Sequence, residues 1–206
     1  MSKLAFIGLG VMGFPMAGHL VTRGGHDVTV YNRSRAKAEA WIAKHKGRFA
    51  ETPAKAAEGA EIVFSCVGDD PDLREVTLGP NGAFQKMAGR AIFVDHTTAS
   101  AKVARELAAE AKKRGFDFLD APVSGGQAGA ENGQLTVMVG GDAATFARAR
   151  PVLQAFGRRI EHVGPVGAGD ALKAVNNALL AINILAAGEG LALLVRAAWR
   201  PAPRWR

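Results

Sequence analysis

The feature that most constrains the fold of this chain is a regular alternation of short apolar runs with helical patterns. Apolar runs of this length predict strands that are buried on both faces. Helical segments between such strands predict an α/β fold with a doubly wound, mostly parallel sheet. The predicted strands are KLAFIG (3–8), HDVTVYN (26–32), EIVFSCV (61–67), RAIFVDH (90–96), DFLDAPV (117–123) and LTVMVGG (135–141).

The predicted helices lie between these strands and after the last one. Ser34 and Ser100 precede two of them, and serine hydroxyls commonly accept a free N–H group at the start of a helix. The strand alternation stops near Gly164, so the sequence predicts a sheet domain over residues 1–164. A single long apolar helix is predicted over residues 165–195.

A glycine pattern, G-x-G-x-x-G, follows the first predicted strand and opens a helix. The pattern alone is common, but a strand–turn–helix–strand context is specific for dinucleotide binding. Gly8 permits the tight turn, Gly10 lets the backbone approach a pyrophosphate, and Gly13 allows close packing. The helix N-terminus adds free N–H groups for the anion. The sequence therefore predicts a Rossmann-type cofactor site formed by Gly8, Leu9, Gly10, Val11, Met12 and Gly13.

The end of the second predicted strand indicates which dinucleotide is preferred. NAD sites usually place an acidic residue there for the ribose 2′-hydroxyl, whereas this chain has Asn32 and Arg33, with Arg35 and Lys37 close behind. Arg33 is suited to bind a 2′-phosphate. We therefore expect NADP to be preferred, with NAD possible. The alternative is that these basic residues are only a solvated start of a helix.

Four segments, FIGLGVMGFPMAGHL, VGDDPDL, DAPVSGGQAGAENGQL and GPVGAGDALKAVNN, together resemble the β-hydroxyacid dehydrogenases. This family contains 3-hydroxyisobutyrate dehydrogenase, tartronate semialdehyde reductase and 6-phosphogluconate dehydrogenase. The phrase VDHTTAS is most similar to the 3-hydroxyisobutyrate dehydrogenase-like branch. The resemblance runs from residue 1 to residue 194. It implies hydride transfer between NADP(H) and a small β-hydroxy acid or its semialdehyde.

The resemblance also assigns roles to individual residues. Val67, Gly68 and Asp72 should border the nicotinamide half of the cofactor, and Thr98 should also contact it. The remaining assignments concern the substrate, whose carboxylate should be held by Ser124, Gly125 and Gly126.

Lys173 matches the catalytic lysine of the family, and Asn177 matches the asparagine that helps to place the substrate. The two residues are four apart, so they share one face of the long helix. A position near the helix N-terminus, with partial burial, should lower the pKa of Lys173 and suit it to proton transfer. Without the resemblance, a lone lysine on a helix is more often a solvated charge.

Other features exclude several classes of function. The last eleven residues hold four arginines and no acid, and without them the net charge falls from +7 to +3, so no nucleic-acid partner is expected. The histidines show no metal-ligand spacing, so no metal is expected. The single cysteine, Cys66, rules out an intramolecular disulfide and favours a cytoplasmic location. Asn183 and Glu189 interrupt the long helix, so no membrane span is expected, and no signal peptide is recognised.

The resemblance implies an all-helical second domain after the long helix, and we expect that domain to be truncated here. Residues 196–206 read as an irregular basic tail with Pro201 and Pro203. We interpret this tail as a shifted reading frame or an early stop; the alternative is a natural short form that docks on a partner. The full-length family form is expected to be a homo-oligomer, and residues 178–195 are expected to dimerise or aggregate. The alternative function is an NADP-binding remnant with little or no catalysis.

Overall fold

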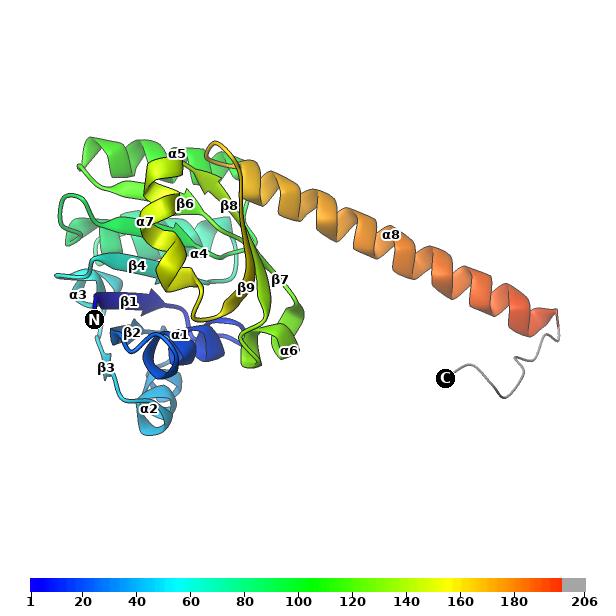
Figure 1. Ribbon diagram of the computed structural model, residues 1–206, viewed down its shortest axis with the longest axis horizontal. Coiled ribbons are helices and arrows are strands. Elements are labelled where there is room, and N and C mark those ends of the chain that lie inside the picture. The colour runs from blue at the N-terminus through cyan, green and yellow to red at the C-terminus, as the bar shows by residue number, and fades with distance from the viewer. Residues whose placement is uncertain (198–206) are drawn as a thin grey trace. The chain divides into compact units, whose positions relative to one another are not determined.

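The computed structural model describes residues 1–197, which form one large mixed sheet with helices and a long C-terminal helix (Figure 1). The strands are β1 (Lys3–Ile7), β2 (Asp27–Tyr31), β3 (Arg48–Phe49), β4 (Ile62–Ser65), β5 (Ile92–Asp95), β6 (Asp117–Asp120), β7 (Val123–Ser124), β8 (Leu135–Gly141) and β9 (Gly157–Gly164). The helices are α1 (Gly13–Thr22), α2 (Arg35–Lys44), α3 (Pro53–Ala57), α4 (Asp70–Leu78), the 3-10 helix η1 (Ala83–Gln85), α5 (Ala101–Lys113), α6 (Gly126–Glu131), α7 (Ala143–Leu153) and α8 (Ala168–Arg196).

The sheet has the strand order β3-β2-β1-β4-β5-β6-β8-β7, with β9 paired to β8. Neighbouring strands from β3 to β6 are parallel, whereas β8 runs antiparallel to β6 and to β7. The prediction of a doubly wound, mostly parallel Rossmann-type sheet is confirmed. Because β2 and β4 lie on opposite sides of β1, the chain reverses its direction across the sheet at β1.

Alternate residues of β1 enter two separate hydrophobic clusters, one on each face of the sheet. Leu4 and Phe6 belong to the cluster that contains the buried residues of α1, α2 and α7, including Trp41. Ala5 and Ile7 belong to the other cluster, with buried residues of α3, α4 and α5. Both faces of the central strands are therefore covered by helices, which explains why the strand sequences are almost continuously apolar.

The predicted strand over 117–123 is divided into β6 and β7. Pro122 lies between them, and a proline nitrogen has no hydrogen to donate to a ladder. Its carbonyl still accepts a bond from the Met138 N–H at 3.0 Å. The break lets β7 pair with β8 by itself and brings Ser124 opposite Thr136.

Helix capping agrees with the predictions in part. The Ser100 hydroxyl accepts from the Val103 N–H at 3.2 Å, as predicted for a cap. Ser34 occupies the N-cap position of α2, but its side chain makes no capping bond there. The sequence analysis did not anticipate α4, whose N-cap, Asp69, accepts from the Asp72 N–H at 3.0 Å.

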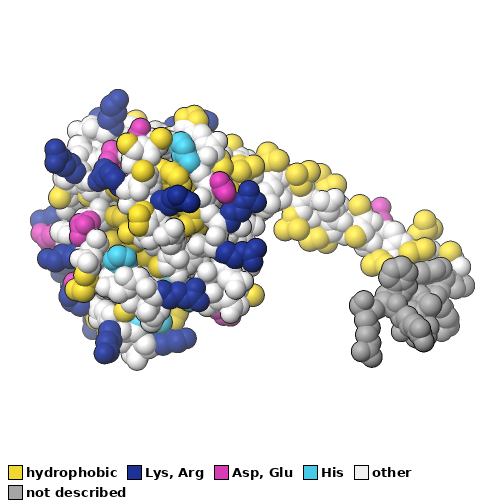
Figure 2. Space-filling model, viewed as in Figure 1, with side chains coloured by type: hydrophobic (Ala, Val, Ile, Leu, Met, Phe, Trp, Pro, Cys, Tyr) yellow, Lys and Arg dark blue, Asp and Glu magenta, His cyan; other side chains and the backbone are white. Residues whose placement is uncertain are grey.

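The compact first unit extends from Met1 to Lys173, and the second unit begins at Ala174. Within the second unit α8 is exposed, and Figure 2 shows hydrophobic side chains along its length. By length and composition alone, α8 is the one helix among residues 1–197 that could cross a membrane, but the core helix of a soluble protein passes the same test. Arg196 ends α8, and residues 198–206 of the predicted tail lie outside the described residues.

Candidate functional site

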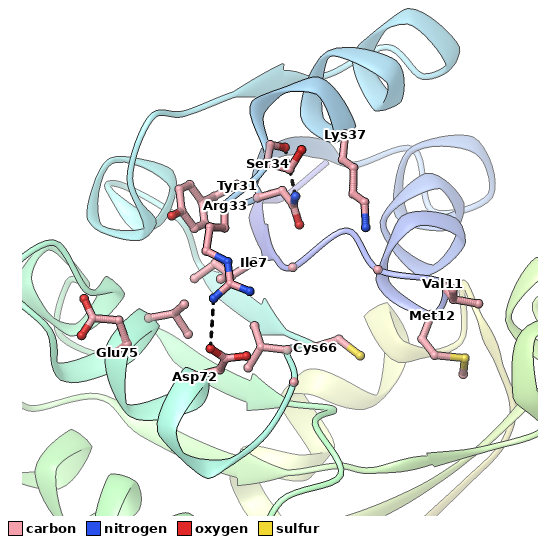
Figure 3. A pocket seen from close by; sticks show the side chains of 16 residues that line it. Ile7, Val11, Met12, Tyr31, Arg33, Ser34, Lys37, Cys66, Asp72 and Glu75 are labelled. Carbon is pink, nitrogen blue, oxygen red and sulfur yellow. Dashed lines mark hydrogen bonds and ion pairs between the residues drawn. The ribbon is translucent and has the colours of Figure 1, made fainter.

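A cavity of about 460 Å³ opens at the carboxyl ends of β1, β2 and β4 (Figure 3). This is the place where the strand order reverses, and open α/β sheets bind ligands at such points. Nine of the twelve predicted cofactor residues line it, and four of these nine belong to the predicted glycine loop. The lining residues are Ile7, Gly8, Gly10, Val11, Met12, Tyr31, Asn32, Arg33, Ser34, Lys37, Cys66, Val67, Gly68, Asp72, Glu75 and Val76.

The three glycines of the predicted loop differ in what surrounds them. Gly8 has a φ of +96°, and a Cβ there would strike the Cys66 carbonyl oxygen. A Cβ on Gly13 would strike the Gly8 carbonyl oxygen, so this residue must be glycine for close packing. A Cβ on Gly10 meets nothing within 4 Å. Gly8 and Gly13 therefore serve the fold, whereas the space beside Gly10 is open to a ligand.

The loop also presents unpaired backbone donors. The N–H groups of Gly10, Val11 and Met12 donate to no acceptor among residues 1–197, while Phe14 already returns a helical bond to the Gly10 carbonyl at 3.0 Å. These donors directly precede α1, so the positive end of its dipole lies beside them. Free N–H groups at a helix start that face a cavity form an anion site suited to a pyrophosphate.

Asn32 holds the loop against the end of β2. Its Oδ1 accepts from the Leu9 N–H at 2.9 Å, and its Nδ2 donates to the Ser34 carbonyl at 3.0 Å. Leu9 is buried and does not line the cavity, so its side chain and its N–H both serve the fold. Leu9 thus helps to fix the loop, and its predicted contact with the cofactor stays a prediction. Gly13 is also buried beneath it.

The basic residues after β2 separate into two groups. Arg33 and Lys37 line the cavity, and the side chain of Arg33 is 87% exposed. Arg35 instead donates to Glu39 at 2.8 Å and lies over the ring of Phe49. Only part of the basic cluster recognised in the sequence is thus available to a phosphate in the cavity.

Asp72 lies in the first turn of α4 and forms an ion pair with Arg33, whose Nη1 is 3.3 Å from Asp72 Oδ1 (Figure 3). The sequence analysis placed it in a loop beside the nicotinamide. The structure places it opposite Arg33, the residue expected to recognise the ribose 2′ position. The sequence DDPD at the capped start of α4 is a signal for a helix that could have been recognised in the sequence.

The loop that contains Val67 is held by Thr97, not by Thr98. The Thr97 hydroxyl accepts from the Val67 N–H at 3.1 Å and donates to the buried Asp95 at 2.7 Å. Thr98 is exposed and does not line the cavity. Burial raises the pKa of Asp95 to about 6, although bonds from Ser65 and Thr97 oppose that shift. The predicted contact of Thr98 with the cofactor therefore stays a prediction, and the sequence analysis did not name Thr97, which positions the loop.

Cys66 lines the same cavity, but burial raises the pKa of its thiol to about 12. A thiol with so high a pKa remains protonated near neutral pH and is a poor nucleophile. The residue therefore contributes packing and wall area rather than chemistry.

The predicted substrate loop follows β7. Ser124 is half-buried, whereas Gly125 and Gly126 are exposed and have φ values of +132° and +60°. These conformations favour glycine and leave the loop backbone open to solvent. No hydrogen bond links Ser124 to Lys173 among the described residues.

Lys173 closes the first compact unit and is half-buried. Burial lowers the pKa of its ammonium group, in the direction that the sequence analysis expected. Asn177 is one helical turn later and belongs to the second unit, where it is exposed. Both side chains emerge from one face of α8.

The buried carboxylate of Asp120 holds the start of α8, and the side chain of Asp170 is also buried there. The sequence analysis identified neither residue. Asp120 accepts from the Gly167 N–H at 2.7 Å and from the Asp170 N–H at 3.1 Å. Asp170 is 2% exposed, and neither of its carboxylate oxygens has a hydrogen-bond partner among residues 1–197. Burial, followed by the charge of Asp120, raises the pKa of Asp170 to about 8. Asp170 is therefore protonated at neutral pH.

The raised pKa of Asp170 predicts a dependence of stability on pH. Between about pH 4 and pH 8 the folded chain keeps a proton that the unfolded chain has released, so the free energy of unfolding falls as pH rises. Asp170→Asn should remove this slope. In urea unfolding, raising the pH from about 5 to about 8.5 should lower the free energy of unfolding of the parent by a few kcal/mol more than that of Asp170→Asn, at ~1.4 kcal/mol per pKa unit.

A matched control is Asp142→Asn. The Asp142 carboxylate accepts from the Thr145 N–H at 2.9 Å, which lowers its pKa. Its contribution to stability is lost as pH falls, the opposite direction. Equal pH slopes for the parent and Asp170→Asn would contradict the burial of an ionisable Asp170.

Comparison with known proteins gives a consistent result. Residues 3–164 match the family described as the NAD binding domain of 6-phosphogluconate dehydrogenase. An uncharacterized oxidoreductase from Shewanella frigidimarina is 59% identical over 191 residues, covering 93% of this chain and 65% of that protein. A 3-hydroxyisobutyrate dehydrogenase from Pseudomonas aeruginosa is 41% identical over 202 residues, covering 98% and 67%.

The structural comparison agrees. The structure of Mycobacterium tuberculosis 3-hydroxyisobutyrate dehydrogenase with L-serine superimposes with a TM-score of 0.91 at 34% identity, covering 97% of this chain and 67% of that one. The chain spans about 65% of the length of the Shewanella relative. The family match over residues 3–164 includes every residue that lines the cavity.

Proposed function

The chain belongs to the 6-phosphogluconate dehydrogenase-type NAD-binding family, within its 3-hydroxyisobutyrate dehydrogenase-like branch, and from this we propose that it transfers hydride between NADP(H) and a small β-hydroxy acid or its semialdehyde. The observation that carries the proposal is that Gly10, Val11 and Met12 line the cavity and that their N–H groups have no acceptor among residues 1–197. A dinucleotide pyrophosphate matches this site in charge and in hydrogen bonding.

Two observations support NADP over NAD. The side chain at the end of β2 that could accept a ribose 2′-hydroxyl is Asn32, whose oxygen is already bonded to the Leu9 N–H. Arg33 follows it, is exposed and lines the cavity, so it is available to a 2′-phosphate. Lys37 adds a second positive charge to the cavity wall.

Lys173 is the proposed general acid and base. In oxidation its neutral amine accepts the proton of the substrate hydroxyl, and in reduction its ammonium form protonates the developing alkoxide. The bound cofactor supplies only the hydride acceptor or donor. Burial favours the neutral amine by lowering the pKa of Lys173, which raises the fraction of base near neutral pH.

The substrate is proposed to be held by its carboxylate. Ser124 offers a hydroxyl, and Gly125 and Gly126 offer exposed backbone N–H groups, while Asn177 offers an amide on the Lys173 face of α8.

The resemblance to the β-hydroxyacid dehydrogenases supports a homo-oligomeric full-length form. The single cysteine, Cys66, is consistent with a cytoplasmic setting.

The test is NADPH oxidation by the 206-residue chain with a panel of small semialdehydes, together with NADPH binding measured by fluorescence. Turnover that requires a semialdehyde supports the proposal. Saturable NADPH binding without turnover on any substrate supports the alternative, a cofactor-binding protein with little catalysis. Absence of binding would contradict the assignment of the cavity.

A further inference from the structure

The ion pair between Arg33 and Asp72 spans the wall of the cofactor cavity. We propose that Asp72 is a specificity-determining residue: it competes with a 2′-phosphate for Arg33 and so reduces the preference for NADP over NAD. The inference rests on the proposed function, because it concerns which dinucleotide the same cavity selects. Arg33 favours NADP and Asp72 opposes it, and the two side chains face one another (Figure 3).

The carboxylate of Asp72 is held in place by its surroundings. The Asp72 N–H donates to the Asp69 side chain at 3.0 Å, which fixes the residue in the first turn of α4. A Cβ added to Gly68 would strike Asp72 Oδ2, so the side chain rests against the Gly68 backbone. The Asp72 side chain is 38% exposed, and its position does not depend on Arg33 alone.

Arg33 is much less constrained. Its side chain is 87% exposed, and a single contact of 3.3 Å joins one Nη atom to one oxygen of Asp72. Exposed pairs of this kind contribute little, so Arg33 can leave Asp72 for a doubly charged phosphate. The exchange still loses one ion pair and leaves the Asp72 carboxylate beside the phosphate that Arg33 has moved to bind.

NAD carries a hydroxyl at the 2′ position of its ribose. Its binding therefore neither breaks the ion pair between Arg33 and Asp72 nor places a phosphate beside the Asp72 carboxylate. The carboxylate therefore penalises NADP selectively, while Arg33 favours it selectively. The balance between the two residues sets the ratio of the two association constants. Glu75 also lines the cavity one turn farther along α4, but it makes no ion pair with Arg33.

The experiment is calorimetric titration of NADP⁺ and NAD⁺ into the 206-residue chain and into Asp72→Asn, Glu75→Gln, Arg33→Ala and Arg33→Ala/Asp72→Asn. Asp72→Asn should raise the NADP⁺-to-NAD⁺ ratio of association constants by about twofold to fivefold, the range expected for one exposed charge contact. The increase should be smaller in the Arg33→Ala background, because competition requires Arg33. Glu75→Gln removes a matched charge from the same helix and should change the ratio less. Adenosine 2′,5′-bisphosphate should show the same increase in affinity as NADP⁺.

An unchanged or lowered ratio in Asp72→Asn would overturn the inference. An equal increase in Glu75→Gln would also overturn it, because the effect would then come from net charge. Arg33 and Glu75 are exposed, and Asp72→Asn keeps the size of a half-buried side chain, so the thermal unfolding of all four variants should match the parent. If neither dinucleotide binds to the parent chain, the proposed function itself fails, and the inference with it.

Discussion

Gly10→Ala should weaken NADPH binding by about 2–3 kcal/mol, roughly 30- to 150-fold, while the chain keeps its fold. A Cβ at Gly10 meets nothing within 4 Å, so the protein accommodates it. The methyl group would occupy the space through which a pyrophosphate reaches the Gly10, Val11 and Met12 N–H groups, and a charged hydrogen-bond partner would be lost. Fluorescence titration of NADPH measures the loss, and thermal unfolding verifies the fold.

Two other glycine substitutions complete this test. Gly89→Ala is the matched control, because its added Cβ would lie 3.6 Å from the Gly115 carbonyl oxygen, an ordinary contact away from the cavity. It should leave both binding and stability unchanged. Gly13→Ala should destabilise the fold, since its Cβ would strike the Gly8 carbonyl oxygen. Undiminished NADPH binding in Gly10→Ala would contradict the proposed pyrophosphate position.

Lys173→Ala should lower kcat for semialdehyde reduction by about 10²- to 10⁴-fold, the usual contribution of a positioned general acid. NADPH affinity should change little, because Lys173 does not line the cofactor cavity. Lys112→Ala is the control, as it removes an exposed lysine from the last turn of α5. A small primary amine added to Lys173→Ala should restore part of the rate by replacing the missing group.

The pH dependence of oxidation provides a separate readout. The neutral amine of Lys173 is the proposed base, and burial lowers its pKa below the ordinary value of 10.5. The rate of hydroxy acid oxidation should therefore rise with pH through this lowered pKa and then level off. Lys173→Ala should lose that rise. If Lys173→Ala shows the same turnover and pH profile as the parent, Lys173 is not the general acid and base.

The sequence predicted the parts of the fold that depend on local patterns. The apolar runs identified the central strands, and the glycine spacing identified the loop at Gly8, Gly10 and Gly13. The long helix was also predicted, and it ends at Arg196, one residue beyond the expected end at residue 195. In each case the residues themselves carry the signal, as buried strand faces, left-handed backbone or helical composition.

The remaining parts depend on contacts between distant segments. β9, with the sequence GRRIEHVG, shows no apolar alternation, because it is an edge strand with one buried residue. Thr97 and Thr98 are adjacent hydroxyl residues, and only the bonds to Asp95 and Val67 distinguish their roles. The Asp120–Asp170 pair joins residues fifty positions apart, which no spacing in the sequence indicates.

The most direct test of the central claim is a ¹⁵N–¹H spectrum of the 206-residue chain recorded during titration with NADP⁺. The claim predicts the largest shifts at the amides of Gly10, Val11 and Met12, where the pyrophosphate should bind, with further shifts at Arg33 and Asp72. The same titration of Gly10→Ala should require much more NADP⁺. Saturable binding that leaves the amides of residues 10–12 unshifted would contradict the account.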